Sequence, residues 1–501
     1  MKLGHLLEAI PEHDLDGDKD IEITGIAYDS RKVAEGYLFV AIKGHSQDGH
    51  AFLNEAVRRG AAAIVAEKFE GFHAGIQKVR VPDSRDALSK LSVKFYDDPC
   101  RNLELIGITG TSGKTSITYL IESIVAVAGG VPGVIGTINS RFKGNVWPSS
   151  VTTPESLDLM RTIREMADSG VTHVIMEVSS HALDQGRISG CPFSVGVFTN
   201  ITRDHLDYHH TVEEYFDAKS LLFRGLIKDR HGRKGIAVIN MDDPKGKVLC
   251  SMTKNDVIAY GLGKDCDISA VDIITDRYGL NATLKTPKGD MKVLSSLIGE
   301  IYVYNILAAT AAAIALGIDI DRIAEGIEGL KGVPGRLESV ANGRGLTIIV
   351  DYSHKPDALI KAQETLRPLT AGRLITVFGC GGDRDRGKRP EMGQAAGERS
   401  DIVFITSDNP RTEDPISIID QIEEGIKKTV ASRLEWTDGK GIKEPCYFIE
   451  PDRRRAIEKA VSIAGEKDII LIAGKGHEDY QIVGKEKRFF DDRHEAAMAA
   501  C

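Results

Sequence analysis

The sequence predicts an α/β protein of three domains, two of which contain a doubly wound sheet of mainly parallel strands. Its 501 residues are more than a single hydrophobic core usually holds. From about residue 333 onward, short apolar runs alternate with helical segments, which is typical of βαβ units. A glycine-rich turn at 107–116 also separates an apolar run from a helical one. We therefore expect domains at 1–98, 99–332 and 333–501.

The first domain is expected to mix short strands with helices. Apolar runs predict strands, and amphipathic segments bounded by polar residues predict helices. A cluster of helix-breaking residues, Asp97-Asp98-Pro99, marks the end of the domain. The expected strands are Ile21–Ala27, Tyr37–Ile42 and Ala61–Ala66, and the expected helices are His50–Arg59 and Asp83–Tyr96.

The middle domain carries short apolar runs of the kind that form buried parallel strands, at His173–Val178, Ser194–Thr199 and Gly235–Asn240. Alternating patterns near 268–274, 279–285 and 291–297 predict a small antiparallel sheet. An alanine-rich helix is expected near 303–316. Its apolar stretch of about 13 residues is too short for a membrane span, so we expect a buried helix and no membrane insertion.

The last domain alternates strands and helices most regularly, which predicts a Rossmann-like sheet. The expected strands are Thr347–Asp351, Leu374–Phe378, Ile402–Thr406, Cys446–Ile449 and Ile469–Ala473, and helices are expected at Pro390–Arg399 and Pro415–Thr429.

Composition narrows the class of protein. The net charge of −9 argues against nucleic acid as the main partner, and the run Arg453–Arg455 is interpreted as a solvated helix face. The seven cysteines are scattered without a CxxC pair, which indicates a reducing, cytoplasmic environment. The N-terminus becomes acidic too early for a signal peptide.

The turn GITGTSGKTS at 107–116 has the composition of a phosphate-binding loop. Gly110 and Gly113 allow the backbone N–H groups to point at phosphate oxygens, Lys114 adds a positive charge, and the Thr115 hydroxyl can bind Mg²⁺. The strict P-loop pattern has glycine at 108, where this chain has isoleucine. The match is to the shorter form GTxGKT, and the middle domain is predicted to be P-loop NTPase-like. The alternative is an ordinary Gly/Ser/Thr turn.

Two polar residues follow apolar strands in the same domain. Glu177 and His205 could hold a divalent cation near a nucleotide, because Mg²⁺ uses few protein ligands and keeps phosphate oxygens. The alternative for His205 is a hydrogen-bonded loop histidine. Lys219 lies on an apparently amphipathic helix, where a surface or snorkelling lysine is the ordinary interpretation.

The last domain also has polar residues at its strand ends. Arg384 and Arg411 could each bind a carboxylate through a bidentate fork, although most arginines are surface residues. Together with Asp408, Asn409 and Glu478, they predict a pocket for a zwitterion. Ligands of doubly wound sheets bind beyond the carboxyl ends of the strands. We therefore expect the two loop edges to face each other across a cleft.

Many motifs along the chain resemble those of Mur ligases, in order and spacing those that add the third residue of the peptidoglycan stem peptide. The resemblance covers nearly the whole chain, including DSRKV near residue 30. The motifs are GTSGKTS (110–116), TTPES (152–156), EVSSHALDQGR (177–187), TNITRDHLDYH (199–209), YFDAKSLLF (215–223), YNILAA (304–309), GRLE (335–338), DYSHKPDAL (351–359), GCGGDRDRGKRP (379–390), DNPRTEDP (408–415) and AGKGHEDYQ (473–481). The departures are small: Ser353 and Lys355 replace the more usual residues.

The resemblance implies a role for each matching residue. ATP would be bound by Gly110, Thr111, Ser112, Gly113, Lys114, Thr115 and Ser116, with Asn305, Arg336 and Asp351 at the adenine or ribose. Two Mg²⁺ ions would be held by Thr115, Glu177, His205 and Lys219, the lysine being carbamylated (N6-carboxylysine). The catalytic residues would be Lys114, His205 and Lys219.

The substrate contacts that the resemblance implies fall into three groups. Ser30 and the loop around His45 to Gln47 would meet the uridine diphosphate. Thr152, Thr153, Ser179, Gln185 and Arg187 would hold the muramoyl dipeptide. Arg384, Asp408, Asn409, Pro410, Arg411, Gly474 and Glu478 would form the diaminopimelate pocket.

The resemblance implies a cytoplasmic, monomeric ATP-dependent amide ligase that joins meso-diaminopimelate to the UDP-muramoyl dipeptide through an acyl phosphate. Such an enzyme serves peptidoglycan synthesis, and through it cell shape and division. The alternatives are an L-lysine-adding or dual-specificity ligase and, more distantly, a non-catalytic nucleotide-binding switch. A folylpolyglutamate-type ligase would lack the uridine-binding first domain.

Overall fold

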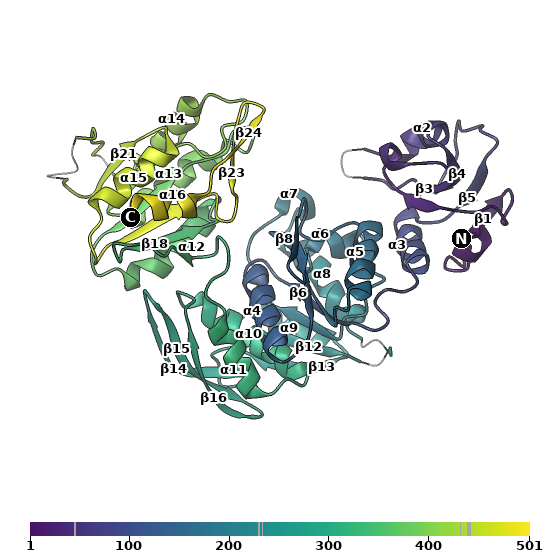
Figure 1. The fold of residues 1–501 in the computed structure, drawn as a ribbon, viewed down its shortest axis with the longest axis horizontal. Helices are drawn as coiled ribbons and strands as arrows, with labels where there is room; N and C mark the ends of the chain where they lie inside the picture. The colour runs from purple at the N-terminus through teal and green to yellow at the C-terminus, as the bar shows by residue number, and fades with distance from the viewer. Residues whose placement is uncertain (45–46, 229–230, 233, 431, 438–441) are drawn as a thin grey trace. The chain divides into compact units, whose positions relative to one another are not determined.

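The computed structural model describes residues 1–44, 47–228, 231–232, 234–430, 432–437 and 442–501. The chain forms two compact units (Figure 1). The first contains Met1–Ser269, Lys285–Gly289 and Asn305–Gly326, and the second contains Ala270–Leu284, Asp290–Tyr304 and Ile327–Cys501. Among the residues that the structure describes, none of the helices combines the length and apolar composition that a bilayer crossing requires.

The N-terminal part of the first unit is built on a five-stranded sheet of order β1-β5-β4-β3-β2, in which only the β1–β5 pair is antiparallel. Apolar side chains of the strands and of α1 and α3 form its core. The strands are β1 (Asp14–Asp16), β2 (Gly25–Ala27), β3 (Tyr37–Val40), β4 (Ala61–Ala66) and β5 (Gln77–Arg80), and the helices are α1 (Leu3–Leu7), α2 (Leu53–Arg58) and α3 (Ser84–Phe95), with short 3-10 turns at Ser30–Lys32 and Gly49–Phe52.

An eight-stranded sheet of order β13-β12-β11-β6-β10-β7-β8-β9 follows in the same unit. The strands from β13 to β7 are parallel, and β8 and β9 extend the sheet antiparallel. The strands are β6 (Glu104–Thr109), β7 (Pro132–Ile135), β8 (Asn139–Phe142), β9 (Asn145–Pro148), β10 (His173–Glu177), β11 (Val195–Phe198), β12 (Ile236–Asn240) and β13 (Asp256–Tyr260).

Helices pack on the parallel part of this sheet. Helix α4 (Lys114–Val127) packs against β6, β7 and β10. A separate apolar cluster joins the sheet to the other helices. These are α5 (Ser156–Asp168), α6 (Ser180–Asp184), α8 (Val212–Leu221) and α9 (Pro244–Met252), with α7 (Leu206–His209) in the loop before α8 and a π-helical turn at Leu222–Leu226 after it.

The alternating patterns after residue 268 form a three-stranded sheet of order β14-β15-β16, as the sequence predicts. Its strands are β14 (Ser269–Asp276), β15 (Gly279–Thr286) and β16 (Gly289–Ser295). The alanine-rich helix is α10 (Ile301–Ala315), followed by α11 (Ile320–Gly329). Most of α10 is buried, so the expectation of a buried helix is confirmed.

The second unit contains a six-stranded sheet of order β17-β18-β22-β19-β20-β21, parallel except for β17. Its strands are β17 (Glu338–Ser339), β18 (Thr347–Asp351), β19 (Leu374–Phe378), β20 (Ile402–Ile405), β21 (Cys446–Ile449) and β22 (Ile469–Ala473). The helices are α12 (Pro356–Leu366), α13 (Lys388–Arg399), α14 (Pro415–Ile426), α15 (Arg453–Ile463) and α16 (Asp492–Ala499), with a 3-10 turn at Arg367–Leu369 and a separate hairpin of β23 (Tyr480–Val483) and β24 (Glu486–Phe489).

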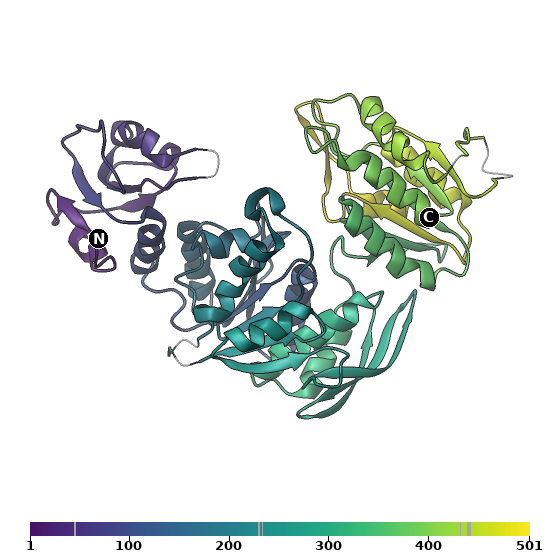
Figure 2. The same ribbon diagram turned by 180° about the vertical axis from the view of Figure 1, so that it is seen from behind.

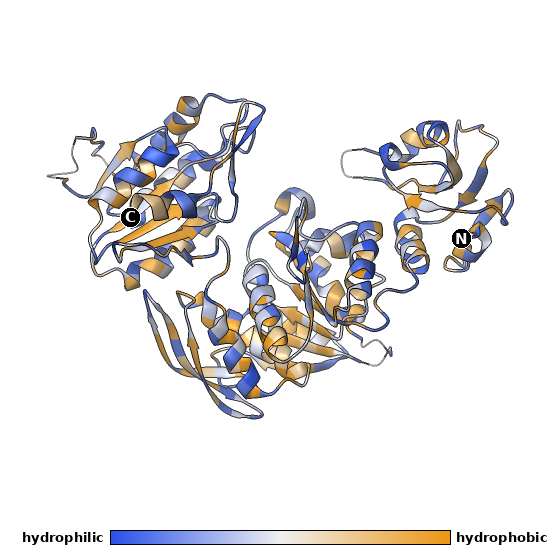
Figure 3. Cartoon of the chain, viewed as in Figure 1, coloured by the Kyte–Doolittle hydropathy of each residue, from blue (hydrophilic) through white to orange (hydrophobic). Residues whose placement is uncertain are grey.

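Both faces of this sheet are covered by helices, which makes it doubly wound. Helices α12, α13 and α14 pack together on one face, and α15 and α16 pack on the other (Figure 2). The strands between the two helical layers are almost uniformly apolar, as the orange ribbons of Figure 3 show. Buried parallel strands have this composition because neither face meets water.

One expectation about charge is wrong. Arg453 is only 1% exposed, whereas Arg454 and Arg455 are exposed as expected of a solvated helix face. The Arg453 guanidinium donates to both carboxylate oxygens of Asp492 at 2.7 Å, and both side chains are fully buried. An arginine in a charged run can enter a core when a distant carboxylate neutralises it, and a local sequence pattern does not reveal that partner.

Candidate active site

The glycine-rich turn forms the loop between β6 and α4. Gly110 and Gly113 have φ values of +144° and +90°, which side chains rarely tolerate. A methyl group at Gly113 would lie 2.6 Å from Asn305 Oδ1, and one at Gly110 would clash with the Thr199 side chain. The loop therefore requires glycine at both positions, and its backbone can approach phosphate oxygens closely.

The segment after β11 holds this loop in place. Asn200 accepts hydrogen bonds from the backbone N–H groups of Thr111 (2.9 Å) and Ser112 (3.0 Å). Thr199 Oγ1 donates to Ser112 O at 2.7 Å, and Thr202 N donates to Thr111 Oγ1 at 3.0 Å. Strands β6 and β11 are neighbours, so their carboxyl ends bring the two segments together.

Two lysines meet at one backbone carbonyl of the loop. Lys114 Nζ donates to Gly110 O at 2.7 Å and to Thr111 O at 2.9 Å, and Lys219 Nζ donates to Gly110 O at 3.0 Å. Lys219 is 1% exposed, so its interpretation as a surface lysine is wrong. Burial, and then the positive charge of Lys114, hold the pKa of Lys219 well below its usual range.

Local structure around Lys219 explains its position. Helix α8 is capped by Thr211 and ends in the π-helical turn Leu222–Leu226, a widening of the helix that often occurs near functional sites. The Lys219 ammonium also lies 4.5 Å from the centre of the Tyr215 ring. The side chain is thus directed to the phosphate loop from a buried helix face.

Glu177 ends β10 next to the same loop and is 1% exposed. Its carboxylate accepts hydrogen bonds from Thr115 Oγ1 (3.0 Å), from Thr137 N (2.9 Å) and from Thr137 Oγ1 (3.0 Å). These three donors are neutral groups, so none of them is an ion-pair partner for the carboxylate. Among the described residues, no cluster of three or more His, Cys, Asp or Glu side chains could hold a metal. A hydroxyl beside a carboxylate fits Mg²⁺, which takes few protein ligands.

His205 lies on the loop after β11, and its backbone φ of +54° is uncommon for a residue other than glycine. Its Nε2 is 3.6 Å from Asp204 Oδ2, and its ring packs edge-on against His181 with centroids 5.1 Å apart. Burial, and then the neighbouring His205 and His209, lower the pKa of His181 to about 4. His181 is therefore neutral at physiological pH. The positive φ of His205 is a backbone strain of the kind that commonly accompanies a functional loop.

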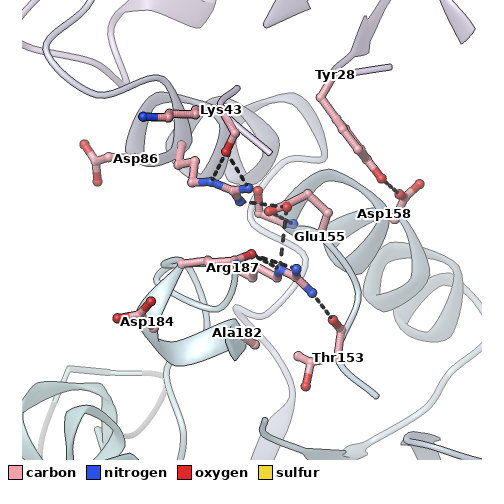
Figure 4. Close-up of polar contacts among 12 residues, drawn as sticks. Tyr28, Lys43, Asp86, Thr153, Glu155, Asp158, Ala182, Asp184 and Arg187 are labelled. Atoms are coloured by element: carbon pink, nitrogen blue, oxygen red, sulfur yellow. Dashed lines mark hydrogen bonds and ion pairs between the residues drawn. The ribbon is translucent and has the colours of Figure 1, made fainter. Parts of the chain in front are cut away.

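The residues predicted to hold the muramoyl dipeptide are connected by hydrogen bonds near the end of β10, and Figure 4 labels two of them, Thr153 and Arg187. Thr153 Oγ1 donates to Glu177 O at 2.8 Å and accepts from Ser179 N at 3.0 Å. The Arg187 guanidinium donates to Thr153 O at 3.0 Å and to Gln185 Oε1 at 2.7 Å. Thr152 joins the cluster through a 3.1 Å hydrogen bond between its hydroxyl and that of Thr137.

The predicted uridine diphosphate contacts are only partly described. Ser30 is buried in the turn Ser30–Lys32, and its hydroxyl donates to Glu55 Oε2 at 3.2 Å. His45 and Ser46 lie outside the described residues.

The residues predicted to contact adenine or ribose belong to different units. Asn305 lies beside Gly113 in the first unit. Arg336 and Asp351 lie together in the second, where Arg336 stacks 5.2 Å from the centre of the Tyr352 ring. Asp351 accepts hydrogen bonds from Leu337 N and from the hydroxyl of Ser353, and burial raises its pKa. Ser353, a departure from the usual motif, thus supports Asp351.

The second predicted pocket lies at the carboxyl ends of neighbouring strands β22, β19 and β20. Asn409 Nδ2 donates to Glu478 Oε2 at 3.0 Å. Lys475 Nζ, which is fully buried, lies 3.3 Å from Asp408 Oδ1 and 3.7 Å from Glu478 Oε2. Burial, and then the Asp408 charge, raise the pKa of Glu478.

Arg411 follows Pro410 in the same pocket, and its φ of +51° is another strained value. Its backbone is held by β23, where Arg411 N donates to Ile482 O at 3.0 Å, and its Nη1 donates to Gly382 O at 2.7 Å. Arg384 is exposed. Gly474, at φ +117°, faces Asp408. All predicted members of this pocket therefore lie on one sheet edge.

Sequence reasoning missed several residues that organise these sites. Thr137 donates to Glu177, and Asn200 accepts from the phosphate loop. Lys475 forms an ion pair with Asp408 in the second pocket. Glu155 forms ion pairs with Arg85 and Arg187. Glu155 and Lys475 stand inside the motifs TTPES and AGKGHEDYQ, so their motifs were found but their roles were not.

A glycine-rich loop with two lysines and a separate group of acids and bases at a second sheet edge agree with the predicted sites. Three family models match the chain: "Mur ligase family, catalytic domain" at 22–96, "Mur ligase middle domain" at 108–313 and "Mur ligase, glutamate ligase domain" at 335–476. The chain belongs to the Mur ligase family.

Relatives match over the full length. The UDP-N-acetylmuramoyl-L-alanyl-D-glutamate--2,6-diaminopimelate ligase of Geobacter metallireducens is 46% identical, covering 100% of this chain and 98% of the relative. That of Geobacillus thermodenitrificans is 45% identical, covering 100% and 99%. A solved structure of a ligase of the same name has a TM-score of 0.72 at 33% identity, covering 100% and 99%.

These comparisons confirm the predicted fold class, an α/β protein of three domains with a P-loop NTPase-like middle sheet and a Rossmann-like C-terminal sheet. The boundaries at 98/99 and 332/333 stay predictions. The individual roles of the site residues stay predictions as well.

Proposed function

We propose that this chain is an ATP-dependent amide ligase that joins meso-diaminopimelate to UDP-N-acetylmuramoyl-L-alanyl-D-glutamate through an acyl phosphate. The observation that carries the proposal is the meeting of Lys114 and Lys219 at the Gly110 carbonyl, on the sheet edge that also holds Thr153, Ser179 and Arg187. This arrangement puts Lys114 and the amine of Lys219 where a triphosphate and an acid substrate would come together.

ATP would bind with its phosphates against the N–H groups of residues 110–116. Lys114 would contact the terminal phosphates, and Asn305 would lie near the nucleoside side of the loop. Backbone N–H groups at a helix N-terminus favour anions, and the positive charges offset the repulsion between ATP and a carboxylate.

Thr115, Glu177, His205 and a carbamylated Lys219 would hold two Mg²⁺ ions. When bound, these ions supply positive charge that stabilises the phosphoryl group during its transfer. The lowered pKa of Lys219 supports the carbamate, because only a neutral amine can attack CO₂. The amine lone pair forms an N–C bond, one C=O π bond breaks, and a proton leaves to water. The buried neutral amine thereby becomes an anionic ligand.

The chemistry needs activation because oxide is a very poor leaving group. A carboxylate oxygen of the dipeptide attacks the γ-phosphorus of ATP, ADP leaves, and an acyl phosphate forms. The amine of the second substrate then attacks the acyl carbon, phosphate leaves, and the amine loses a proton. Thr153, Ser179 and Arg187 would orient the acid, and the reacting atoms must come within about 3–3.5 Å.

The second unit's pocket would bind the amino acid. Asp408 and Glu478 suit its ammonium group, and Arg411 suits the carboxylate at the far end of diaminopimelate. L-lysine lacks that second carboxylate, so Arg411 favours diaminopimelate over a lysine-adding or dual-specificity ligase.

We place the reaction in the cytoplasm, in peptidoglycan precursor synthesis, and propose that the protein works as a monomer.

The test is to incubate the purified protein with ATP, the UDP-muramoyl dipeptide and a panel of diamino acids, and to identify products by mass spectrometry. ADP release that requires both the dipeptide and the diamino acid supports a ligase. Turnover without either substrate would favour the nucleotide-binding switch.

A further inference from the structure

Arg85, on α3 of the N-terminal sheet domain, contacts two other segments of the first unit through Lys43 and Glu155, which Figure 4 labels. Its Nε and Nη2 donate to the backbone carbonyl of Lys43 at 3.3 and 3.1 Å. Its Nη1 donates to Glu155 Oε2 at 2.9 Å. The guanidinium thus ties the Lys43 carbonyl to the Glu155 carboxylate through all three of its nitrogens.

Glu155 is the acid that receives this contact. It is the fourth residue of TTPES and the N-cap of α5, and its side chain is 12% exposed. Its Oε2 accepts from Arg85 and also lies 3.5 Å from Arg187 Nε. Two guanidinium groups from different segments thus share one carboxylate oxygen in a partly desolvated place, where ion pairs are stronger than at the surface.

Arg187 has its orientation fixed by three further hydrogen bonds. Its Nη1 donates to Thr153 O at 3.0 Å, and its Nε and Nη2 donate to Gln185 Oε1 at 3.1 and 2.7 Å. Gln185 Nε2 in turn donates to Tyr208 OH at 3.1 Å. An arginine carries five N–H groups, and these bonds need only three, so Nη1 and Nη2 can each direct a second N–H to a substrate oxygen.

We propose that Glu155 and Arg85 are positioning residues that hold Arg187 and the Thr153 turn in the geometry that binds the UDP-muramoyl dipeptide. Lys43, which Arg85 holds by its carbonyl, leads into the loop predicted to meet the uridine diphosphate. The relay from Lys43 through Arg85 and Glu155 to Arg187 therefore links the predicted binding regions for the two ends of one substrate. The proposal rests on the proposed function of Arg187.

A different contact joins the same two parts of the first unit and serves as a control. Tyr28, which follows β2, donates its hydroxyl to Asp158 on α5. This hydrogen bond does not involve Glu155, Arg85 or Arg187. If mere attachment of α5 to the N-terminal domain matters, removing the Tyr28 hydroxyl should have the same effect as removing the Glu155 charge.

The experiment measures kcat and the KM of each substrate for the full-length wild type and for Glu155→Gln, Arg85→Gln, Glu155→Asp and Tyr28→Phe. Glu155→Gln and Arg85→Gln should each raise the KM of the UDP-muramoyl dipeptide by about 5- to 30-fold. The KM values of ATP and the diamino acid should stay within about twofold. Glu155→Asp keeps the charge and should remain within about threefold of the wild type, as should Tyr28→Phe.

The double variant Arg85→Gln/Glu155→Gln separates a relay from two independent contacts. In a relay, the second substitution breaks a link that is already lost, so the double variant should be no worse than the poorer single variant. If the fold increase in dipeptide KM of the double variant equals the product of the two single increases, the relay is overturned. An unchanged dipeptide KM in Glu155→Gln, or an equal rise in Tyr28→Phe, would overturn the positioning role.

Thermal unfolding of each variant shows whether a change in KM reflects loss of the fold, and Arg85→Gln gives an independent reading if Glu155→Gln is unstable. A wild-type protein that does not ligate the dipeptide would refute the proposed function. A wild type that ligates normally, with Glu155→Gln and Arg85→Gln indistinguishable from it, would refute this inference alone.

Discussion

The phosphate loop of the first unit and the acid–base pocket of the second handle charge in opposite ways. At the loop, the side chains of Lys114 and the buried Lys219 both donate to the Gly110 carbonyl. In the pocket, Lys475 lies between two carboxylates, those of Asp408 and Glu478. The first site thus brings two lysines to one neutral acceptor, whereas the second sets its lysine between two acids.

This difference matches the two kinds of ligand that the proposed reaction requires. A triphosphate brings several negative charges, so a loop with backbone N–H groups and a lysine at a neutral carbonyl suits it. An amino acid carries an ammonium and a carboxylate group, so its pocket needs both acids and bases. When the amino acid binds, these acids and bases can exchange a contact with each other for a contact with the ligand. Lys219 belongs to the first kind of site, and its amine is buried.

The largest effect is expected from Lys219→Ala, which removes the buried amine at the phosphate loop. Turnover should fall by about 10³-fold, because a charge that acts on the transferred phosphoryl group is lost. Steady-state kinetics with and without added acetate measures this, and acetate should restore part of the activity by replacing the carbamate.

Lys245→Ala is the matched control, since Lys245 also lies over an aromatic ring, at 4.8 Å from the centre of Phe216. Its activity should stay close to that of the wild type. Full activity in Lys219→Ala would remove the lysine from the mechanism.

The next effect concerns the acid–base pocket. Lys475→Met leaves Asp408 and Glu478 without their buried cation and should lower the free energy of unfolding of the second unit by about 3 kcal/mol. Chemical denaturation measures the change. Lys487→Met is the control, because Lys487 is exposed and lies over the same Tyr480 ring. Equal stability in the two variants would show that Lys475 does not balance the acids.

Substitution of Arg411 tests the choice of amino acid. Arg411→Ala should raise the KM of diaminopimelate by about 10-fold or more, since a charge-assisted contact is lost. The ratio of kcat/KM for diaminopimelate to kcat/KM for L-lysine should also fall. Arg384→Ala, at an exposed position, should have a smaller effect. Kinetics with both amino acids would contradict the pocket assignment if the KM values did not change.

The smallest effect is a pH dependence. Burial and Asp408 raise the pKa of Glu478, so its carboxylate takes up a proton at a higher pH than an ordinary glutamate. As the pH falls through this raised pKa, the negative charge is lost and the diamino acid should bind a few-fold more weakly. The KM of the diamino acid, measured across acidic pH, should lose this dependence in Glu478→Gln. An identical profile in both proteins would exclude Glu478 as the titrating group.

Much of the fold could be predicted from local pattern. Strands β4, β18, β19, β21 and β22 begin and end at the predicted residues, because short apolar runs bounded by polar residues form buried parallel strands. The expected strand Ile21–Ala27 is shorter, with β2 covering only Gly25–Ala27. The helix expected at His50–Arg59 begins as a 3-10 turn capped by Asp48, and α2 starts at Leu53.

Charged residues whose state depends on distant partners could not be predicted in the same way. Arg453 is buried because Asp492 lies beside it, 39 residues later in the chain. Lys219 is buried because α8 directs it to a carbonyl 109 residues earlier. A helical pattern gives the face on which such a residue lies, but the partner that makes burial possible comes from tertiary structure.

The most direct test of the account is to follow oxygen from the acid to the phosphate. The UDP-muramoyl dipeptide is prepared with heavy oxygen in the carboxylate that forms the new amide, and the products are separated after one turnover. The account predicts one labelled oxygen in the released phosphate, because the acid attacks ATP before the amine attacks the acid. Phosphate without label would contradict the acyl phosphate and the joint action of the two sites.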